Sequence, residues 1–353
     1  MQLVAYGAQD VYLTGNPQIT FFKVVYRRHT NFSKECIEQT FSGAVGDNKR
    51  VSATLARNGD LVQEVYLKCG GKTTADNTNM IKWVECEIGG QKIDKQYGAW
   101  LDIYNNLFET NHDYRLAMTS GTDTNYVPLR FWFNRNPGLA LPLIALQYHE
   151  VKINMELGLI GGTDATLLVN YLYLDTDERR RFAQVSHEYL IEQVQHTGVE
   201  TVANGKITMN FNHPVKCLVW KSDKVLDTAK IQLNGHDRAA VQDGDYYRWV
   251  QPYESGLGHS TVLHVAADGT RSWVGANDAT ASDSTQNHYV YLYSFALKPA
   301  EHQPSGTCNF SRIDNAVLNL AHGTGNDSEV SLHAVNYNVL RVMSGMGGLA
   351  YSN

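Results

Sequence analysis

Short stretches in which apolar and polar residues alternate recur along the whole chain. The alternation is clearest at 50–55, 64–69 and 151–157, where every second residue is apolar. This period of two is typical of strands that turn one face to a core and the other to solvent. Turn-forming pairs such as Gly89-Gly90 and Asn234-Gly235 separate the stretches and accept the left-handed backbone of tight turns. The pattern predicts a mostly β chain built from many short strands.

One segment has the period of a helix instead. Its apolar residues lie at positions i, i+3, i+4, i+7 and i+8 and share one helical face. They are Trp100, Ile103, Tyr104, Leu107 and Phe108. We expect a helix here whose apolar face packs across one end of a β-sandwich.

Several local patterns occur twice, in the same order along the chain. The pairs are 37–39 with 191–193, 50–69 with 206–220, 87–90 with 232–235, 131–133 with 293–295, and 169–171 with 335–337. Five matches in one order indicate a duplication, in which loop insertions change the spacing between the copies. The largest candidate insertion is the polar, glycine-containing stretch 254–287. Loops of this length are uncommon unless they bind or pack against something.

The length of 353 residues suits two domains of roughly 150 residues each. We predict an all-β fold of two tandem eight-stranded antiparallel jelly-roll β-sandwiches, a double jelly roll, with short helices in loops. The charged window 175–181 is the expected boundary. This divides the chain into an N-terminal arm (1–25), a first domain (26–178) and a second domain (179–353).

Composition excludes several classes of protein. Hydrophobic residues make up 43% of the chain, enough for sizeable cores, and the formal net charge of −6 disfavours a protein that coats nucleic acid. The five cysteines lack C-x-x-C spacing, so neither a disulfide framework nor a zinc site is indicated. No apolar run reaches the ~18 residues of a membrane-spanning helix, and the first residues lack the features of a secretory signal. We expect a soluble protein made inside the cell.

Motifs that carry enzyme chemistry are missing from the sequence. The thirteen histidines show no H-E-x-x-H spacing, no G-x-S-x-G nucleophile motif occurs, and the glycines at 345–348 are followed by no helix that would bind phosphate. We therefore predict no catalytic residues, no cofactor and no metal site.

Two other kinds of candidate site remain. Sequons for N-glycosylation begin at Asn31, Asn309 and Asn326, although a chain without a secretory signal is expected to keep them unmodified. Aromatic residues and arginine are favoured in protein interfaces. Five of them lie beside turns or in the long loop, where we expect contact with a neighbouring subunit: Trp132, Arg135, Trp249, Tyr253 and Trp273.

Longer blocks of sequence carry a more specific signal. They lie at 3–23, 26–32, 131–149, 174–182, 305–314 and 336–351. Through these blocks, which run from end to end, the chain resembles the major capsid proteins of nucleocytoplasmic large DNA viruses, especially those of algal and giant viruses.

The resemblance implies a structural role in the icosahedral shell of a large double-stranded DNA virus. Three copies would form a trimeric, pseudo-hexagonal capsomer, because two similar domains per subunit give six similar edges. The implied partners are the homotrimer, neighbouring capsomers, minor capsid proteins and an internal viral membrane beneath the shell, without direct contact to nucleic acid. The N-terminal arm would run beneath the capsomer toward its neighbours. The expected location is the virion, assembled in the host cytoplasm.

Alternative functions remain open from the sequence. One is a low-copy variant or minor double jelly-roll capsid protein. Another is a tandem β-sandwich that binds carbohydrate. A third is a glycoside hydrolase that uses paired carboxylates such as Glu85 and Glu87, although alternating glutamates are usually the solvated face of a strand.

Overall fold

The computed structural model describes residues 7–70, 80–109, 118, 124–202, 204–238, 240–257, 261–265, 271–275, 289–322 and 328–351. The chain forms two compact units, Met1–Asn31 and Phe32–Asn353. In the first unit, helix α1 (Ala8–Thr14) is followed by chain without regular structure, and all of its described residues are exposed. The strands described below belong to the second unit.

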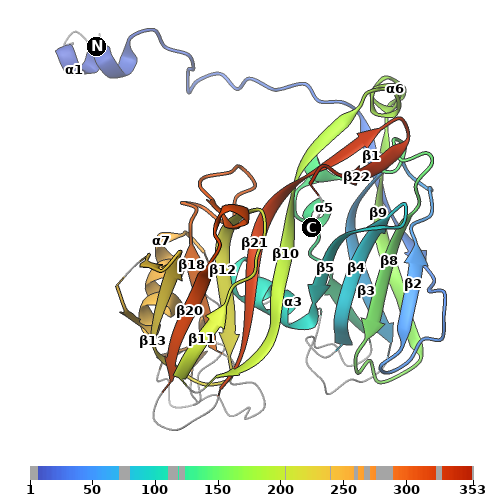
Figure 1. Cartoon of the computed structure of the whole chain (residues 1–353). Coiled ribbons are helices and arrows are strands. Elements are labelled where there is room, and N and C mark those ends of the chain that lie inside the picture. Colours follow the sequence, from blue (N-terminus) through green and yellow to red (C-terminus); the bar gives the residue numbers. More distant parts are fainter. Residues whose placement is uncertain are drawn as a thin grey trace. The chain divides into compact units, whose positions relative to one another are not determined.

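The first β-sandwich consists of a five-stranded and a four-stranded antiparallel sheet, which face each other (Figure 1). Sheet A has the order β1 (Phe32–Gln39), β9 (Asp164–Leu174), β3 (Leu61–Gly70), β6 (Thr124–Pro128), and the short β7 (Leu141–Pro142) also pairs with β3. Sheet B has the order β2 (Arg50–Thr54), β8 (Val151–Leu157), β4 (Ile81–Ile88), β5 (Gln91–Tyr97). One hydrophobic core contains side chains from both sheets.

The second β-sandwich repeats this strand order. Sheet C runs β10 (His187–Val202), β21 (Ser328–Met343), β12 (Pro214–Ser222), β18 (Tyr289–Ser294), with β19 (Cys308–Asn309) and β22 (Met346–Leu349) at its margins. Sheet D runs β11 (Asn204–Thr208), β20 (Ala316–His322), β13 (Leu226–Leu233), β14 (His236–Asp237), with β15 (Gln242–Asp243) on β13. A separate hairpin joins β16 (Thr261–Val265) to β17 (Arg271–Gly275).

The eight strands in the two sheet orders of each sandwich can be numbered along the chain. The first, eighth, third and sixth then form one sheet, and the second, seventh, fourth and fifth form the other. This is the jelly-roll order, and its repetition confirms the predicted fold. The repeated sequence patterns fall on equivalent strands: 37–39 lies on β1 and 191–193 on β10, whereas 169–171 lies on β9 and 335–337 on β21. The duplication in the sequence is therefore a duplication of topology.

Two equivalent tight turns follow the predicted residues. Gly89 and Gly90 have φ of 57° and 85°, and Asn234 and Gly235 have φ of 51° and 77°. Each pair connects two antiparallel strands through a two-residue loop, and positive φ at both central residues is what such a loop requires. The same turn chemistry thus closes the same hairpin in both sandwiches.

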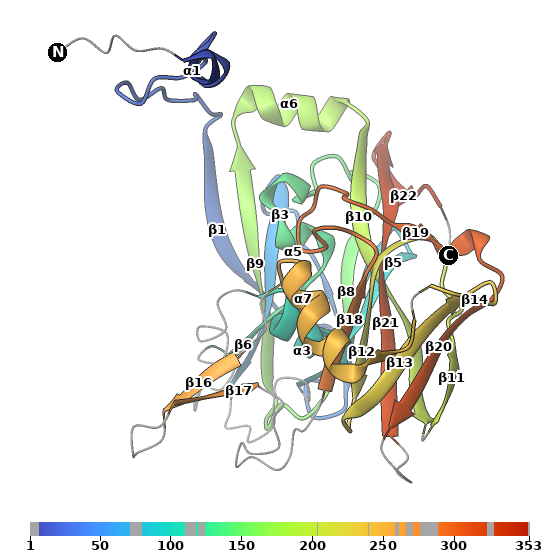
Figure 2. The ribbon, with the colours of Figure 1, turned by 90° about the vertical axis from the view of Figure 1, so that its left-hand side faces the viewer.

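Short helices lie in the connections. In the first sandwich α3 (Gly98–Leu107) follows β5, and in the second a π-helical turn η2 (Tyr246–Val250) and α7 (Gln251–Glu254) follow β15. The remaining ones are α5 (Trp132–Arg135), η1 (Pro137–Leu139), α6 (Thr176–Gln184) and η3 (Phe310–Arg312). Figure 2 shows α6 connecting the end of β9 to the start of β10. The side chain of Asp175 caps α6 by accepting a hydrogen bond from the Thr176 amide at 2.8 Å.

Candidate functional site: the junction between the two sandwiches

Sheet C is buried on both faces. Along β12, Leu218 and Trp220 point into the core of the second sandwich, whereas Cys217 and Val219 belong to a separate cluster that also contains Trp100 of α3. Helix α3, from the first sandwich, therefore covers the outer face of sheet C. Our expectation that this helix packs across the end of a sandwich was wrong. The apolar side of α3 is buried against the outer face of sheet C, which is also apolar. The periodicity within the helix does not reveal which surface it covers.

We call this region, formed by α3, α5 and β5 of the first sandwich with β10, β12, β18 and β21 of the second, the junction. Its hydrophobic part consists of ring and aliphatic side chains from both sides. They are Trp100, Ile103, Leu107, Cys217, Val219, Leu257, Val290, Leu292 and Val335. Burial of this many apolar groups is the main term that holds the two sandwiches together.

A buried cluster of charges lies in the junction. The Glu192 carboxylate on β10 contacts the Arg135 guanidinium at 2.6 Å and the Lys216 ammonium at 2.7 Å. Burial alone would raise the pKa of Glu192, but the positive charges of Lys216 and Arg135 outweigh it and hold that pKa below its ordinary value. The Arg135 guanidinium also lies 4.6 Å from the ring centre of Tyr104 on α3. The cluster thus connects α3 and α5 to β10 and β12.

Strand β5 of the first sandwich is joined to β10 by polar contacts. Asp94 Oδ1 accepts a hydrogen bond from the Val194 amide at 3.1 Å, and its Oδ2 accepts one from Gln96 Nε2 at 2.8 Å. The side-chain amide of Gln193 donates to the Ile93 carbonyl. Asp94 is fully enclosed, and burial raises its pKa to about 6. These bonds fix the edge of sheet B against the edge of sheet C.

The C-terminal hairpin crosses to the first sandwich. Strand β22 pairs with the end of β21, and Leu340 and Val342 of β21 belong to the core of the first sandwich. His149 Nδ1 lies 3.0 Å from the Gly347 carbonyl oxygen. The long strands β10 and β21 run between the two sandwiches (Figure 1) and so contribute to both.

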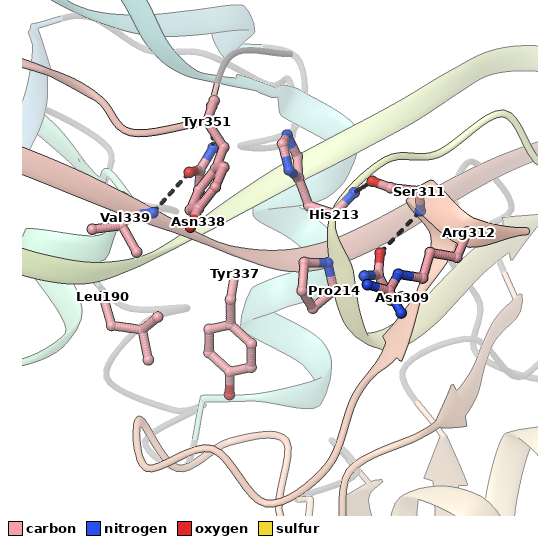
Figure 3. A pocket seen from close by; sticks show the side chains of 10 residues that line it. All are labelled: Leu190, His213, Pro214, Asn309, Ser311, Arg312, Tyr337, Asn338, Val339 and Tyr351. Carbon is pink, nitrogen blue, oxygen red and sulfur yellow. Dashed lines mark hydrogen bonds between the residues drawn. The ribbon is translucent and has the colours of Figure 1, made fainter.

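A pocket of about 460 Å³ opens beside the junction (Figure 3). Its polar groups are largely paired with one another: the Asn338 side chain accepts from the Val339 amide at 2.7 Å and donates to the Tyr351 carbonyl at 3.0 Å. The lining residues are Leu190, His213, Pro214, Asn309, Ser311, Arg312, Tyr337, Asn338, Val339 and Tyr351. No carboxylate or thiol side chain is among them, so the pocket holds no pair of acid and base groups that would support hydrolysis.

Comparison with known proteins identifies the family. Residues 20–175 match the family described as major capsid protein N-terminus, and residues 178–225 and 279–348 match the family described as large eukaryotic DNA virus major capsid protein. The chain belongs to the major capsid proteins of large eukaryotic DNA viruses.

Individual relatives agree with this assignment. A major capsid protein of Pyramimonas orientalis virus is 52% identical, with 100% of this chain and 99% of that protein aligned. That of Paramecium bursaria Chlorella virus 1 is 43% identical with the same coverage. The crystal structure of PBCV-1 VP54, fitted into a reconstruction of the virophage Sputnik, superposes with a TM-score of 0.78 at 39% identity and covers 95% of this chain and 100% of its own.

The Faustovirus major capsid protein has the same fold at only 12% identity, with a TM-score of 0.69, and covers 96% of this chain and 94% of its own. The relatives above 30% identity are major capsid proteins, so the protein is a structural component of the virion capsid and not an enzyme, as the sequence predicted.

The residues predicted to face a neighbouring subunit fall into two groups in this capsid protein. Trp132 is 1% exposed and packs in the core of the first sandwich, and Arg135 belongs to the charged cluster of the junction. Both serve contacts within the chain. Trp249 and Tyr253 lie on η2 and α7 and are 37% and 85% exposed. Trp273 lies on β17, where the side chains are outside the described part.

The sequons of the capsid protein differ in their surroundings. Asn31 is exposed in the first unit. Asn309 is exposed, and its side chain accepts a hydrogen bond from the Ser311 amide at 3.1 Å, as an N-cap of η3. Asn326 lies outside the described residues. That these candidate sites stay unmodified remains a prediction.

Metal-binding and membrane-spanning features are not seen in the described ranges. Within them, no group of three or more histidine, cysteine, aspartate or glutamate side chains is arranged to hold a metal ion. No helix among the described residues has the length and apolar character needed to span a membrane.

Sequence reasoning missed most of the junction. A signal was present at 215–221, where Lys216 and Lys221 interrupt an apolar run. A lysine within a buried strand needs a buried partner, and the structure supplies Glu192 for Lys216 and Asp102 for Lys221, the latter at 3.2 Å.

Proposed function

We propose that three copies of this capsid protein form a trimeric capsomer with a pseudo-hexagonal outline, which tiles the shell. The observation that carries the proposal is the repetition of one strand order in two sandwiches of the same chain. A trimer of such chains has six similar units around its threefold axis. The buried junction supports the proposal, because it makes the two sandwiches one firm building block.

The division of the chain follows from the same proposal. We assign residues 1–25 to an arm, 26–178 to the first jelly-roll domain and 179–353 to the second. In the trimer, the exposed Trp249 and Tyr253 would contact the next subunit around the axis. Exposed aromatic side chains of this kind are frequent anchors of protein interfaces.

The arm would reach other components of the shell. Residues 1–31, which contain the arm, include Lys23, Arg27 and Arg28 but a single acid, Asp10, and so carry 3 − 1 = +2 while the whole chain carries −6. Many of the large apolar side chains of this segment are exposed: Val11, Tyr12, Leu13, Ile19, Phe21, Phe22, Val24, Val25 and Tyr26. Exposed apolar surface of this extent is typical of a segment that binds a partner. Neighbouring capsomers, minor capsid proteins and an internal membrane are the proposed partners.

The experiment is size-exclusion chromatography with light scattering on the full chain. The proposal predicts a particle of three times 39.5 kDa. In the Tyr253→Ala variant, the trimer should dissociate at about tenfold higher protein concentration. For a trimer of identical chains this is an about hundredfold larger dissociation constant, or roughly 2.8 kcal/mol per trimer. Tyr148→Ala, which removes another exposed tyrosine (77% exposed), is the matched control and should remain trimeric.

A monomer at all concentrations would contradict the trimer. If that monomer also bound oligosaccharides, the carbohydrate-binding alternative would gain support. Equal weakening by both tyrosine variants would remove α7 from the proposed interface.

A further inference from the structure

Two histidines face each other across neighbouring strands in the junction. His196 on β10 is in register with His333 on β21, and their rings stack with centroids 4.4 Å apart. His333 is 0% exposed. Three of their ring nitrogens form no hydrogen bond of ordinary geometry within the described part of the chain. They are Nδ1 and Nε2 of His333 and Nε2 of His196. Such a pair is unusual, because buried polar atoms are normally bonded.

Aromatic groups of the first sandwich enclose the pair. The Trp100 ring of α3 lies 5.5 Å from that of His333, and the Tyr97 ring at the end of β5 lies 4.9 Å from that of His196. The histidines therefore sit between sheet C and the elements that cover its outer face. A change in their charge acts directly on the contact between the two sandwiches.

Protons have a route to this position. A pocket of about 340 Å³ is lined by His196 and by residues from both sandwiches. The charged groups that face the pair or line this pocket are Lys82 on β4, Asp102 on α3, Lys221 on β12, Asp223 after β12, and Glu329 on β21. The Asp102 carboxylate is engaged by Lys221 at 3.2 Å, so it does not neutralise a charge on the histidines.

Protonation is disfavoured in the folded chain. Burial lowers the pKa of His333 well below its ordinary value, and the nearby His196 and Lys221 lower it further. Burial also lowers the pKa of His196. A proton on His333 places a positive charge against His196 and Lys221, and the backbone of Ser331 opposes this only in part. Access of water to the His333 ring would relieve this cost, and water reaches that fully buried ring only if α3 moves away from sheet C.

We propose that the His196–His333 pair makes the junction acid-sensitive, so that protonation loosens the packing of α3 on sheet C. In a capsid subunit with this pair, the contact between the two sandwiches is stable at neutral pH and weaker at acidic pH. This property concerns each chain by itself and does not depend on the oligomeric state.

The direction of the pH effect follows from the two states of the chain. The folded chain holds both histidine pKa values below the unfolded value of about 6.5. Above about pH 6.5 the pair is neutral in both states and does not reduce the stability of the fold. As the pH falls from about 6.5 toward the pKa values of the folded chain, the stability decreases. Asp94 acts in the opposite sense, because its raised pKa of about 6 favours folding as pH falls. Variants are needed to separate the two effects.

Hydrogen–deuterium exchange of the full chain tests the proposal. Exchange of the α3 amides is compared at about pH 7.5 and about pH 5 after correction for intrinsic rates, in the wild type and in His333→Phe. Opening of α3 in the wild type should increase about tenfold in acid, because the opened state takes up protons that the closed state excludes. In His333→Phe, which keeps a ring against Trp100 but leaves His196 in place, the increase should be clearly smaller.

Two further variants complete the experiment. His236→Phe changes an exposed histidine on β14 and should behave as the wild type. His196→Gln should reduce the acid response as His333→Phe does, and it replaces that variant if the latter does not fold. Unchanged α3 exchange in the wild type, or an equal increase in His333→Phe, would overturn the proposal.

Discussion

The ammonium group of Lys216 lies 2.7 Å from a carboxylate oxygen of Glu192, and the two side chains are 3% and 7% exposed. Lys216 belongs to β12 and Glu192 to β10, and the second carboxylate oxygen of Glu192 contacts Arg135 of the first sandwich at 2.6 Å. One buried acid thus forms ion pairs with two bases. The two sandwiches are therefore connected by buried ion pairs as well as by apolar packing.

Loss of the shared carboxylate should be costly. We expect Glu192→Gln to lower the free energy of unfolding by about 3–5 kcal/mol, because it leaves two buried cations without an anion. Urea denaturation followed by circular dichroism measures this loss. The matched control is Glu301→Gln, which removes an exposed partner of Lys298 (58% and 65% exposed) and should change stability by less than about 1 kcal/mol. Similar losses in both variants would contradict the role of the cluster.

Asp94 should make the protein less stable as pH rises from acid to neutral. Its folded pKa of about 6 lies above the unfolded value of about 3.9, so its contribution is complete below pH ~3.9 and is lost as pH rises through about 6. The loss amounts to about 3 kcal/mol at most. Asp94→Asn should therefore lose less stability than the wild type between about pH 4.5 and pH 7. Unfolding measured at several pH values checks this.

A suitable comparison for Asp94 is Asp227→Asn, at an exposed position on β13. Its pH profile should follow that of the wild type. A profile for Asp94→Asn that also coincides with the wild type would show that Asp94 does not titrate in this range.

The two glycines of the β4–β5 turn should differ in their tolerance of a side chain. Both have positive φ, so alanine costs roughly 1–2 kcal/mol of backbone strain at either position. A Cβ on Gly89 would also collide with the ring of His149, whereas a Cβ on Gly90 meets nothing within 4 Å. We expect Gly89→Ala to lower the midpoint of thermal unfolding clearly more than Gly90→Ala. The collision at Gly89 would displace His149 from the Gly347 carbonyl oxygen. Equal effects of the two variants would therefore mean that the position of His149 does not contribute to stability.

Removal of residues 1–25 should separate folding from assembly. None of the described residues 7–25 belongs to a hydrophobic core, so the thermal unfolding midpoint should stay within about 2 °C of the full chain. Co-sedimentation with purified shell components should weaken, because the exposed apolar side chains of the arm are lost. Full binding by the shortened chain would remove the arm from the proposed contacts.

Much of the fold could be predicted from local sequence. Alternation at 151–157 predicted a strand, and β8 has that burial pattern. Turn residues such as Asn234-Gly235 carry their own conformational preference, so they need no knowledge of distant parts of the chain. The paired segments could be found because both copies keep the same strand order.

The junction could not be predicted in the same way. Along β12 nearly every residue is buried, and a continuous apolar run does not say which element covers each face. The contact between His196 and His333 depends on the register of strands far apart in sequence. Trp132 was placed in an interface because it lies beside a turn, yet its ring fills the first core.

The most direct test of the account is a cryo-electron microscopy reconstruction of the assembled shell, at a resolution that traces individual strands. We predict capsomers in which three copies of the chain place six jelly-roll sandwiches around a threefold axis, with α3 of each copy packed against its own sheet C. Capsomers with any other number of copies, or with the two sandwiches of one chain separated from each other, would contradict it.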